Sequence, residues 1–374
     1  MRSSILKILI AIASIGLVCF AALPPMRAVS PPPDGGYANF NTAEGNGALF
    51  ALTTGLDNTA IGEVALAHLT IGSENTATGA YALSGNQTGS NNTATGSRAL
   101  LNNTASDNTA TGSSALSSNT TGEDNTAVGF AALSGNTIGN DNTATGFEVL
   151  LNNTSGSSNT ASGLHAMQFN TTGSDNTASG LIALQSNTTG AENTALGALA
   201  LATNSTGKNN TAEGSGALAN ATTGSNNVAV GFDAGLNLKA GNNNIILGAN
   251  VPGTASDANT IRIGKQGTQK STFVAGIYPT VVTGSTVVIS SAGKLGIATS
   301  SARFKNQIKP MENASEAVLA LKPVTFRYKE EVDPDQAPQF GLVVEKVSPN
   351  LVIHDEEGKP FTVRYEAVNA MPAE

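Results

Sequence analysis

The feature that most constrains this chain is a repeat of 17 residues, which reads N-T-A-x-G-x-x-A-L-x-x-N-x-T-G-x-x. Thirteen repeats begin between Asn41 and Asn244, and each step is 17 residues except the step from Asn92 to Asn108, which is 16. A fixed period of this length is typical of solenoids, in which each repeat forms one turn that stacks on its neighbours. Repeat positions are numbered here from 1, the first Asn.

The fixed positions of the repeat predict how each turn is built. Position 5 is Gly in all thirteen repeats, and position 15 is Gly in the full-length repeats before Asn244, whereas Ser106 is predicted to take position 15 in the short repeat. Such glycines indicate corners with positive φ or close backbone approach. Because Gly and Asn at this density oppose helix formation, we predict two short extended segments per turn, each ending at a Gly corner.

Three kinds of side chain have a predicted place in the stacked turns. Ala at position 3 and Leu at position 9 are the predicted interior. The Asn residues at positions 1 and 12 are predicted to form ladders, in which side chains bond to one another and to corner carbonyls. A core of Ala and Leu is thin for one chain, so we place the Leu ladder between protomers and predict an oligomer.

The charge of the chain restricts its partners. Only 12% of residues are charged and the net charge is −8, which leaves no basic surface for nucleic acid. The histidines, His68, His165 and His354, are scattered along the sequence. We therefore predict no metal site and no cofactor.

The repeats resemble the head of YadA-like trimeric bacterial adhesins over about residues 41–250. The resemblance implies a left-handed parallel β-roll or solenoid of about 13 turns that packs as a homotrimer. The expected fold class is mostly β: this solenoid, a β neck, and a small C-terminal α+β domain. Host, matrix or glycan surfaces are the ligands that such a fibre would meet.

The N-terminal 28 residues have the pattern of a secretory signal peptide. Arg2 and Lys7 precede an apolar stretch, and a Pro- and Gly-rich linker follows at 29–40. The alternative is a retained membrane anchor. We expect export to the cell surface, either associated with the outer membrane or extracellular. Cys19 is the only cysteine, so the exported chain is expected to be stable without a disulfide.

Beyond the repeats the sequence predicts a neck and a second domain. Residues 251–299 alternate β-branched and turn residues, which favours short strands and hairpins. From residue 300 the composition becomes ordinary, and the segment 312–322 carries apolar residues at helical spacing. Further strands are predicted in residues 324–329, 340–347 and 361–368.

The stretch "ATSSARFKNQI", residues 298–308, contains a candidate catalytic pair, Ser300 and Lys305. Ser is a poor nucleophile until a base takes its proton, and Lys is such a base only when its surroundings lower its pKa. Ser–Lys pairs of this kind are a known variant of nucleophilic catalysis. Spacing alone is weak support, because Ser and Lys five residues apart are common.

The segments "TSSARFKNQIKPM", "LALKPVTFRYK", "FGLVVEKV" and "VRYEAVNAM" together resemble the endosialidase-type intramolecular chaperone domain, over residues 299–371. The resemblance implies a domain, here residues 300–374, that assists trimerisation and then cuts the chain once, between Thr299 and Ser300. It assigns Ser300 as nucleophile, Lys305 as base and Arg303 as a supporting basic residue. Any enzymatic activity is thus a single-turnover autoproteolysis by a serine peptidase dyad.

Three departures from that family keep an alternative open. The stretch "GLVVEKVSPNLV", residues 341–352, is shorter than the family's usual form. Ser301 stands where many members have Asp. The family continues into a long C-terminal helix that forms a trimeric coiled coil, whereas Pro372 opposes a helix at this place. The alternative is a purely structural or adhesive surface protein whose C-terminal domain is a cleavage-inactive cap.

Overall fold

The computed structural model divides the chain into two compact units, Met1–Ile277 and Tyr278–Glu374, which are described separately. The described part is mostly β, and its helices are short 3-10 turns. The structure describes residues 37–274, 287–290, 292–297, 307, 320–331, 333, 335–355, 357–363 and 365.

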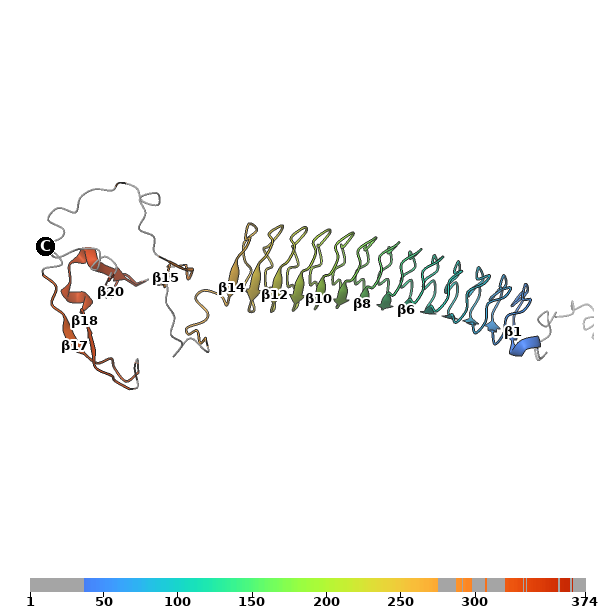
Figure 1. Ribbon diagram of the computed structural model, residues 1–374, viewed down its shortest axis with the longest axis horizontal. Helices are drawn as coiled ribbons and strands as arrows, with labels where there is room; N and C mark the ends of the chain where they lie inside the picture. Colours follow the sequence, from blue (N-terminus) through green and yellow to red (C-terminus); the bar gives the residue numbers. More distant parts are fainter. Residues whose placement is uncertain are drawn as a thin grey trace, which may run out of the picture. The chain divides into compact units, whose positions relative to one another are not determined.

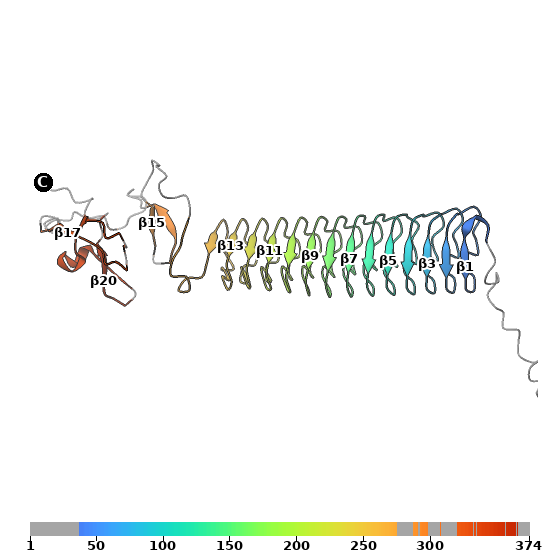
Figure 2. The same cartoon turned by 90° about the horizontal axis from the view of Figure 1, so that it is seen from below.

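The first unit is a parallel β-solenoid, as the repeat predicted (Figures 1 and 2). A 14-stranded sheet takes its strands in sequence order, and every neighbouring pair that it contains is parallel. The 3-10 helix η1 (Ala38–Phe40) precedes it. The strands are β1 Thr42–Glu44, β2 Thr59–Ile61, β3 Thr76–Thr78, β4 Thr93–Thr95, β5 Thr109–Thr111, β6 Thr126–Val128, β7 Thr143–Thr145, β8 Thr160–Ser162, β9 Thr177–Ser179, β10 Thr194–Leu196, β11 Thr211–Glu213, β12 Val228–Val230, β13 Ile245–Leu247 and β14 Ile261–Ile263.

Each turn contributes one strand, at repeat positions 2–4, and not the two extended segments predicted. The second segment cannot be a regular strand because positions 7 and 9 have positive φ, 60° at Val64 and 49° at Leu66. It still stacks on the next turn, since the Leu66 N–H donates to the Ala82 carbonyl at 3.0 Å. Both sides of the turn are therefore tied to their neighbours by backbone hydrogen bonds.

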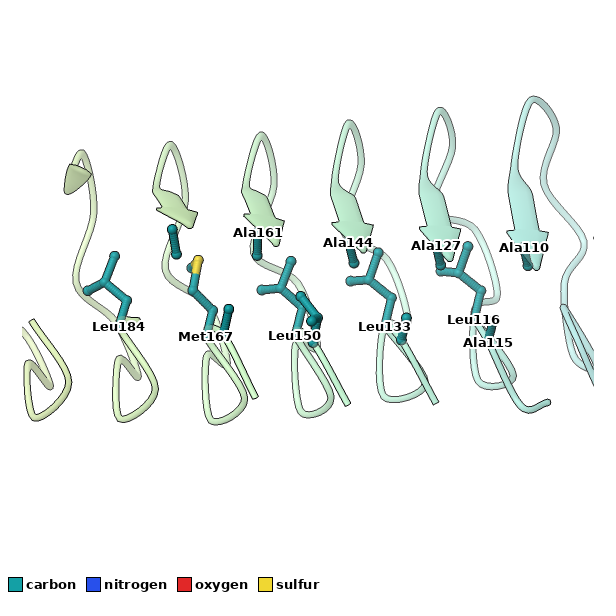
Figure 3. Close-up of a cluster of buried hydrophobic side chains, with 14 of the residues drawn as sticks. Ala110, Ala115, Leu116, Ala127, Leu133, Ala144, Leu150, Ala161, Met167 and Leu184 are labelled. Carbon is teal, nitrogen blue, oxygen red and sulfur yellow. The ribbon is translucent and has the colours of Figure 1, made fainter. Parts of the chain in front are cut away.

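The interior of the solenoid is filled by Ala and Leu from a single chain. Ala144 of β7 and Leu150 at position 9 are both 0% exposed, and Val149 at position 8 lies beside them, equally buried. The interior assignment of positions 3 and 9 is confirmed. The placement of the Leu ladder between protomers is wrong, because each turn covers its own leucine. Figure 3 shows the strand alanines Ala110, Ala127, Ala144 and Ala161 opposite the side chains of Leu116, Leu133, Leu150 and Met167.

The predicted Asn ladder at position 1 runs through the buried interior. Asn159 is 0% exposed, and its Nδ2 donates to Asn142 Oδ1 at 3.1 Å and to the Gly173 carbonyl at 2.9 Å. Its Oδ1 accepts from both the N–H and the Nδ2 of Asn176, at 3.1 and 3.0 Å. One side chain thus satisfies buried polar groups in the turns on either side of it.

The second Asn ladder, at position 12, ends on the same corner carbonyls. Asn170 Nδ2 donates to the Gly173 carbonyl at 2.9 Å and to Asn153 Oδ1 at 2.7 Å. Each such corner carbonyl therefore accepts from both ladders, which leaves few unpaired polar groups beside the apolar core.

Two kinds of corner glycine have different reasons to be glycine. Gly163, at position 5, has φ +129°, and an added Cβ would lie 2.5 Å from the Gly180 carbonyl oxygen. Gly156, at position 15, has no positive φ, but an added Cβ would lie 2.3 Å from the Gly173 oxygen. Position 5 thus needs both the conformation and the space, whereas position 15 needs the space alone.

The 16-residue repeat corrects one detail of the predicted alignment. Asn92 Nδ2 donates to the Ala105 carbonyl at 2.9 Å, just as Asn75 Nδ2 donates to the Gly89 carbonyl at 2.9 Å in the repeat before it. Ala105, and not Ser106, therefore takes position 15. The missing residue precedes the corner, at position 14, where no side chain has a role in the core.

An ion pair closes the C-terminal end of the solenoid core. In β14, Arg262 lies in register with Ile246 of β13, at the inward position that Ala holds in most turns. Its Nε and Nη2 donate to the two carboxylate oxygens of Asp257 at 2.6 and 2.8 Å, and Thr254 Oγ1 donates to the same carboxylate at 2.7 Å. A polar last turn of this kind prevents further stacking on an apolar end.

We expect the Asp257→Asn substitution to lower the free energy of unfolding by about 1–2 kcal/mol at neutral pH. The bidentate geometry strengthens the ion pair, whereas the partial exposure of Arg262 to solvent weakens it. The hydrogen bond from Arg262 lowers the pKa of Asp257 from 3.8 to about 2. Since the folded-state pKa is depressed, this stabilisation is present above about pH 4 and is lost as the pH falls towards 2.

Hydrogen exchange of β13 and β14 across this pH range measures the effect. The difference in exchange protection between the wild-type chain and Asp257→Asn should shrink as the pH falls from 5 to 2, because the Asp257 carboxylate is protonated as the pH approaches its pKa of about 2. Asp141→Asn, which changes an exposed carboxylate in the middle of the solenoid, is the control. An equal effect of both variants at every pH would contradict the assignment.

In the part of the second unit that the structure describes, the strands form three antiparallel pairs. The strand predicted at 324–329 is present over 324–326 in β17, and the one predicted at 361–368 is present over 361–363 in β20. The strand predicted at 340–347 ends at Gly341 in β18, and the 3-10 helix η4 follows it. Hairpin β15–β16 agrees with the hairpins predicted for the neck. Residues 312–319 of the predicted helix lie outside the described residues. The pairs are β15 Val287–Ile289 with β16 Leu295–Ile297, β17 Val324–Phe326 with β18 Gln339–Gly341, and β19 Val352–His354 with β20 Pro360–Val363; the 3-10 helices are η4 Val344–Lys346 and η5 Pro349–Leu351.

Candidate functional site

The predicted cleavage site lies outside the described residues. This holds for the scissile pair Thr299 and Ser300, for the base Lys305 and for the supporting Arg303. Their roles stay predictions from the sequence. The functional surfaces that the structure does place are in the second unit and on the outside of the solenoid.

The described part of the second unit contains an open pocket of about 240 Å³. The rings of Phe326 and Tyr328 meet edge to face on one side of it, with centroids 5.2 Å apart. Residues 342–344 and 361–363 line the rest, together with Tyr365, whose hydroxyl accepts a hydrogen bond from the Leu342 N–H at 3.2 Å. The lining groups are mostly aliphatic or aromatic, which suits an apolar side chain better than a polar ligand.

Large apolar side chains of this unit remain uncovered in the single chain. Phe340 is 83% exposed and Phe361 is 70% exposed, whereas Leu351, Val352 and Val363 are among the few buried ones. A unit that buries so little and exposes aromatic side chains presents a surface for protein contact. These side chains are available to a partner chain.

The longest row of exposed large apolar side chains on the solenoid runs through four successive turns. It consists of Phe130, Phe147, Leu164 and Leu181, all at position 6, and we call it the position-6 ridge. Each member is between 44% and 49% exposed. Phe130 and Phe147 stack on each other, with ring centroids 5.2 Å apart and an angle of 16° between the rings.

A row of short polar side chains, most of them carboxylates, precedes the same strands, at position 17. We call it the position-17 row. In the turns beside the ridge its members are exposed and have positive φ between 57° and 59°. Short polar side chains tolerate that conformation best. The members there are Asp124, Asp141, Ser158, Asp175 and Glu192, of which all but Ser158 are carboxylates.

A small polar cluster borders the ridge. His165 Nδ1 lies 3.4 Å from Glu148 Oε2, and Gln168 Nε2 donates to the same carboxylate oxygen at 2.9 Å. The Phe147 ring meets the His165 ring edge-on, at a centroid distance of 5.6 Å. Among the residues that the structure describes, no group of three or more His, Cys, Asp or Glu side chains gathers as a metal site would require.

The position-6 ridge was not predicted from the sequence, because the residue at position 6 varies from repeat to repeat. The signal was present in the local order: large apolar residues occupy position 6 in four consecutive repeats, from Phe130 to Leu181. A consensus taken over thirteen repeats hides such a local run.

Comparison with known proteins gives one family match, which lies in the C-terminal region. The searches of curated proteins and of solved structures returned no match. Within the described residues, no helix combines the length and apolar character needed to cross a membrane. The match to a family model covers only part of the second unit and begins at the predicted cleavage boundary. Residues 300–353 match the family described as "Chaperone of endosialidase", whose domains are associated with trimer assembly.

Proposed function

We propose that this chain is an exported bacterial surface fibre, in which a trimeric β-solenoid is assembled by a C-terminal intramolecular chaperone that then cuts itself free. The observation that carries the proposal is the order of the two parts. A 14-stranded solenoid is followed, from residue 300, by a match to an endosialidase chaperone. A chaperone that follows a repetitive rod in the same chain has that rod as its expected substrate.

The need for assembly is supported by the exposed surfaces of both units. In the second unit Phe340 and Phe361 are largely uncovered. In the solenoid the position-6 ridge leaves four large apolar side chains about half exposed. Burying apolar surface contributes about 25 cal/mol per Å², so joining copies of the chain stabilises both units. The homotrimer is the assembly state that the family match favours.

The chemistry of release follows from the residues at the boundary. Lys305 takes the proton of Ser300 Oγ, which attacks the Thr299 carbonyl carbon. The C–O bond forms, the C–N bond breaks, and the proton passes to the amine of Ser300. Water then hydrolyses the ester, which returns the Ser300 hydroxyl and leaves a carboxylate on Thr299. The family match begins at Ser300 itself, which supports this boundary.

Export and an adhesive role are further parts of the proposal. The basic and apolar pattern of residues 1–28 supports secretion, and the lone Cys19 fits a fold that needs no disulfide. The low-charge, repetitive outer face suits contact with host, matrix or glycan surfaces. Fractionation of the native host and labelling of intact cells would locate the chain.

Expression of the chain beside Ser300→Ala tests self-cleavage. We expect the wild-type chain to release a C-terminal fragment that begins at Ser300, and the variant to stay at full length, because alanine has no nucleophilic oxygen. Ser301→Ala, one residue along, is the matched control and should be cut as the wild type is. Denaturing gels and intact mass measure all three chains.

If the wild type and Ser300→Ala both stay at full length, self-cleavage is wrong and the cleavage-inactive cap is the better description. That result leaves assembly untouched, since a cap can template a trimer without cutting it. Cleavage that persists in Ser300→Ala would instead point to another nucleophile or to a contaminating protease.

A further inference from the structure

We propose that the position-6 ridge faces the three-fold axis of the assembled fibre, where each ridge meets its copies, with the position-17 row turned outward. The inference rests on the proposed trimer and deepens it by naming the contact surface of the solenoid. The occupant of the ridge is a second copy of this chain.

The first argument is that the core of each turn does not need the ridge. Leu133, Leu150 and Met167 fill the interior beside it and are 0% exposed, so the fold of each turn is complete without position 6. Among residues 37–274, no longer row of exposed large apolar side chains occurs in successive turns. Surplus apolar side chains in one line indicate a contact with another macromolecule.

The second argument is that the ridge is held rigidly at a fixed spacing. The N–H of His165 donates to the Phe147 carbonyl at 3.1 Å, and the N–H of Ile182 donates to the Leu164 carbonyl at 2.9 Å. Each ridge residue thus stands one turn above the previous one. In parallel copies aligned by the same C-terminal region, equal ridge residues stand at equal heights, so ridges match along their whole length.

The third argument comes from symmetry. In a cyclic trimer, surfaces away from the axis pair with a different surface of the neighbour, whereas residues at the axis meet their own copies. A single apolar row on each chain can form an apolar contact with its own copies only at the axis. The ridge meets that condition, because it offers the same side chains, Phe130 to Leu181, to each of the other two copies.

The fourth argument is the separation of charge. Within one turn, Asp141 precedes strand β7 and Phe147 follows it, so the carboxylate and the ridge residue lie at opposite ends of the strand. Three copies of the position-17 row cannot converge on the axis, because like charges without water repel strongly. With the acidic end outward, the apolar end is the one left to face inward.

Single-cysteine cross-linking tests the orientation in the full-length chain. In a Cys19→Ser, Ser300→Ala background, Leu164→Cys places a thiol on the ridge and Ser158→Cys places one in the position-17 row. Both parent side chains are exposed. Upon oxidation or treatment with a short bis-maleimide, we expect covalent dimers from Leu164→Cys and only monomers from Ser158→Cys on denaturing gels.

Sedimentation of the same samples separates the two levels of the inference. If the samples have the mass of a trimer but Ser158→Cys cross-links, or Leu164→Cys does not, the ridge does not face the axis, although the chain is still a trimer. A monomer mass would overturn the proposed trimer and the ridge with it. Leu164 thiols that label fully while the mass is trimeric would assign the ridge to a different occupant.

A second pair of variants gives an independent readout. Phe147→Ser removes apolar surface from the ridge, and Asp141→Ser is the control at the other end of the same strand. We expect Phe147→Ser to weaken assembly at least about tenfold, measured by dilution. The circular dichroism of the dissociated chain should stay unchanged, since Phe147 is outside the core. Equal assembly of both variants would contradict the ridge.

Discussion

The Asn159→Ala variant is expected to destabilise the solenoid by about 2–6 kcal/mol, because two buried N–H donors lose their acceptor at about 1–3 kcal/mol each. The donors are the backbone N–H and the Nδ2 of Asn176, which both bond to Asn159 Oδ1. Water cannot replace the lost acceptor, because Asn159 is 0% exposed. Chemical denaturation of the full chain measures the loss.

Asn152→Ala is the matched control for this prediction. Asn152 is the same residue type in the neighbouring repeat, but its side chain is exposed. We expect it to change the free energy of unfolding by less than about 0.5 kcal/mol. If both variants unfold at the same denaturant concentration, the Asn ladder does not stabilise the solenoid and the account of its interior is wrong.

The Gly163→Ala substitution is expected to lower the free energy of unfolding by a similar amount, about 2–6 kcal/mol, for two separate reasons. The added methyl group meets the Gly180 carbonyl oxygen of the next turn at 2.5 Å, and the backbone has φ +129°. Neither neighbour can move without breaking the stacking of the following turn. Thermal and chemical unfolding should both shift.

Two further glycines separate the causes. Gly47 has φ +72° but nothing within 4 Å of an added Cβ, so Gly47→Ala tests backbone strain alone. Gly156 lacks a positive φ but would bring a Cβ to 2.3 Å from the Gly173 oxygen, so Gly156→Ala tests the clash alone. We expect each to cost less than Gly163→Ala. A larger loss at Gly47 than at Gly163 would contradict the role given to close stacking.

The sequence was most informative where one residue type has one physical use. Gly at position 5, Asn at positions 1 and 12, and Ala at position 3 recur because a corner, a buried hydrogen-bond ladder and a narrow core each allow little else. The period therefore predicted the solenoid, its Asn ladders and its interior. It also predicted an extended segment that ends at the position-5 glycine, where Thr143–Thr145 forms a strand.

Predictions were wrong where the answer depended on backbone conformation or on which surface is covered. Leu66 sits at φ 49°, which non-glycine residues rarely adopt, and this converts the second predicted strand into a turn. A thin Ala and Leu core indicated a shared interior, but Leu150 is covered by its own chain. The proposed contact surface is instead on the outside of the solenoid, at position 6, where the residue type varies between repeats and gives no consensus.

The candidate cleavage site shows a different limit. Ser300 and Lys305 have no distinctive spacing, so composition and periodicity could not select them from the other Ser and Lys residues of the chain. The resemblance of the surrounding segment selected them, and the family match over residues 300–353 supports the domain but not the act of cleavage.

The mass of the assembled chain in solution tests the central claim most directly. Sedimentation equilibrium of the full-length Ser300→Ala chain, which keeps its C-terminal region whether or not the wild type is cut, should give three chain masses across a wide range of concentration. A single chain mass under the same conditions would contradict the account, because neither the chaperone nor the position-6 ridge would then have a partner copy.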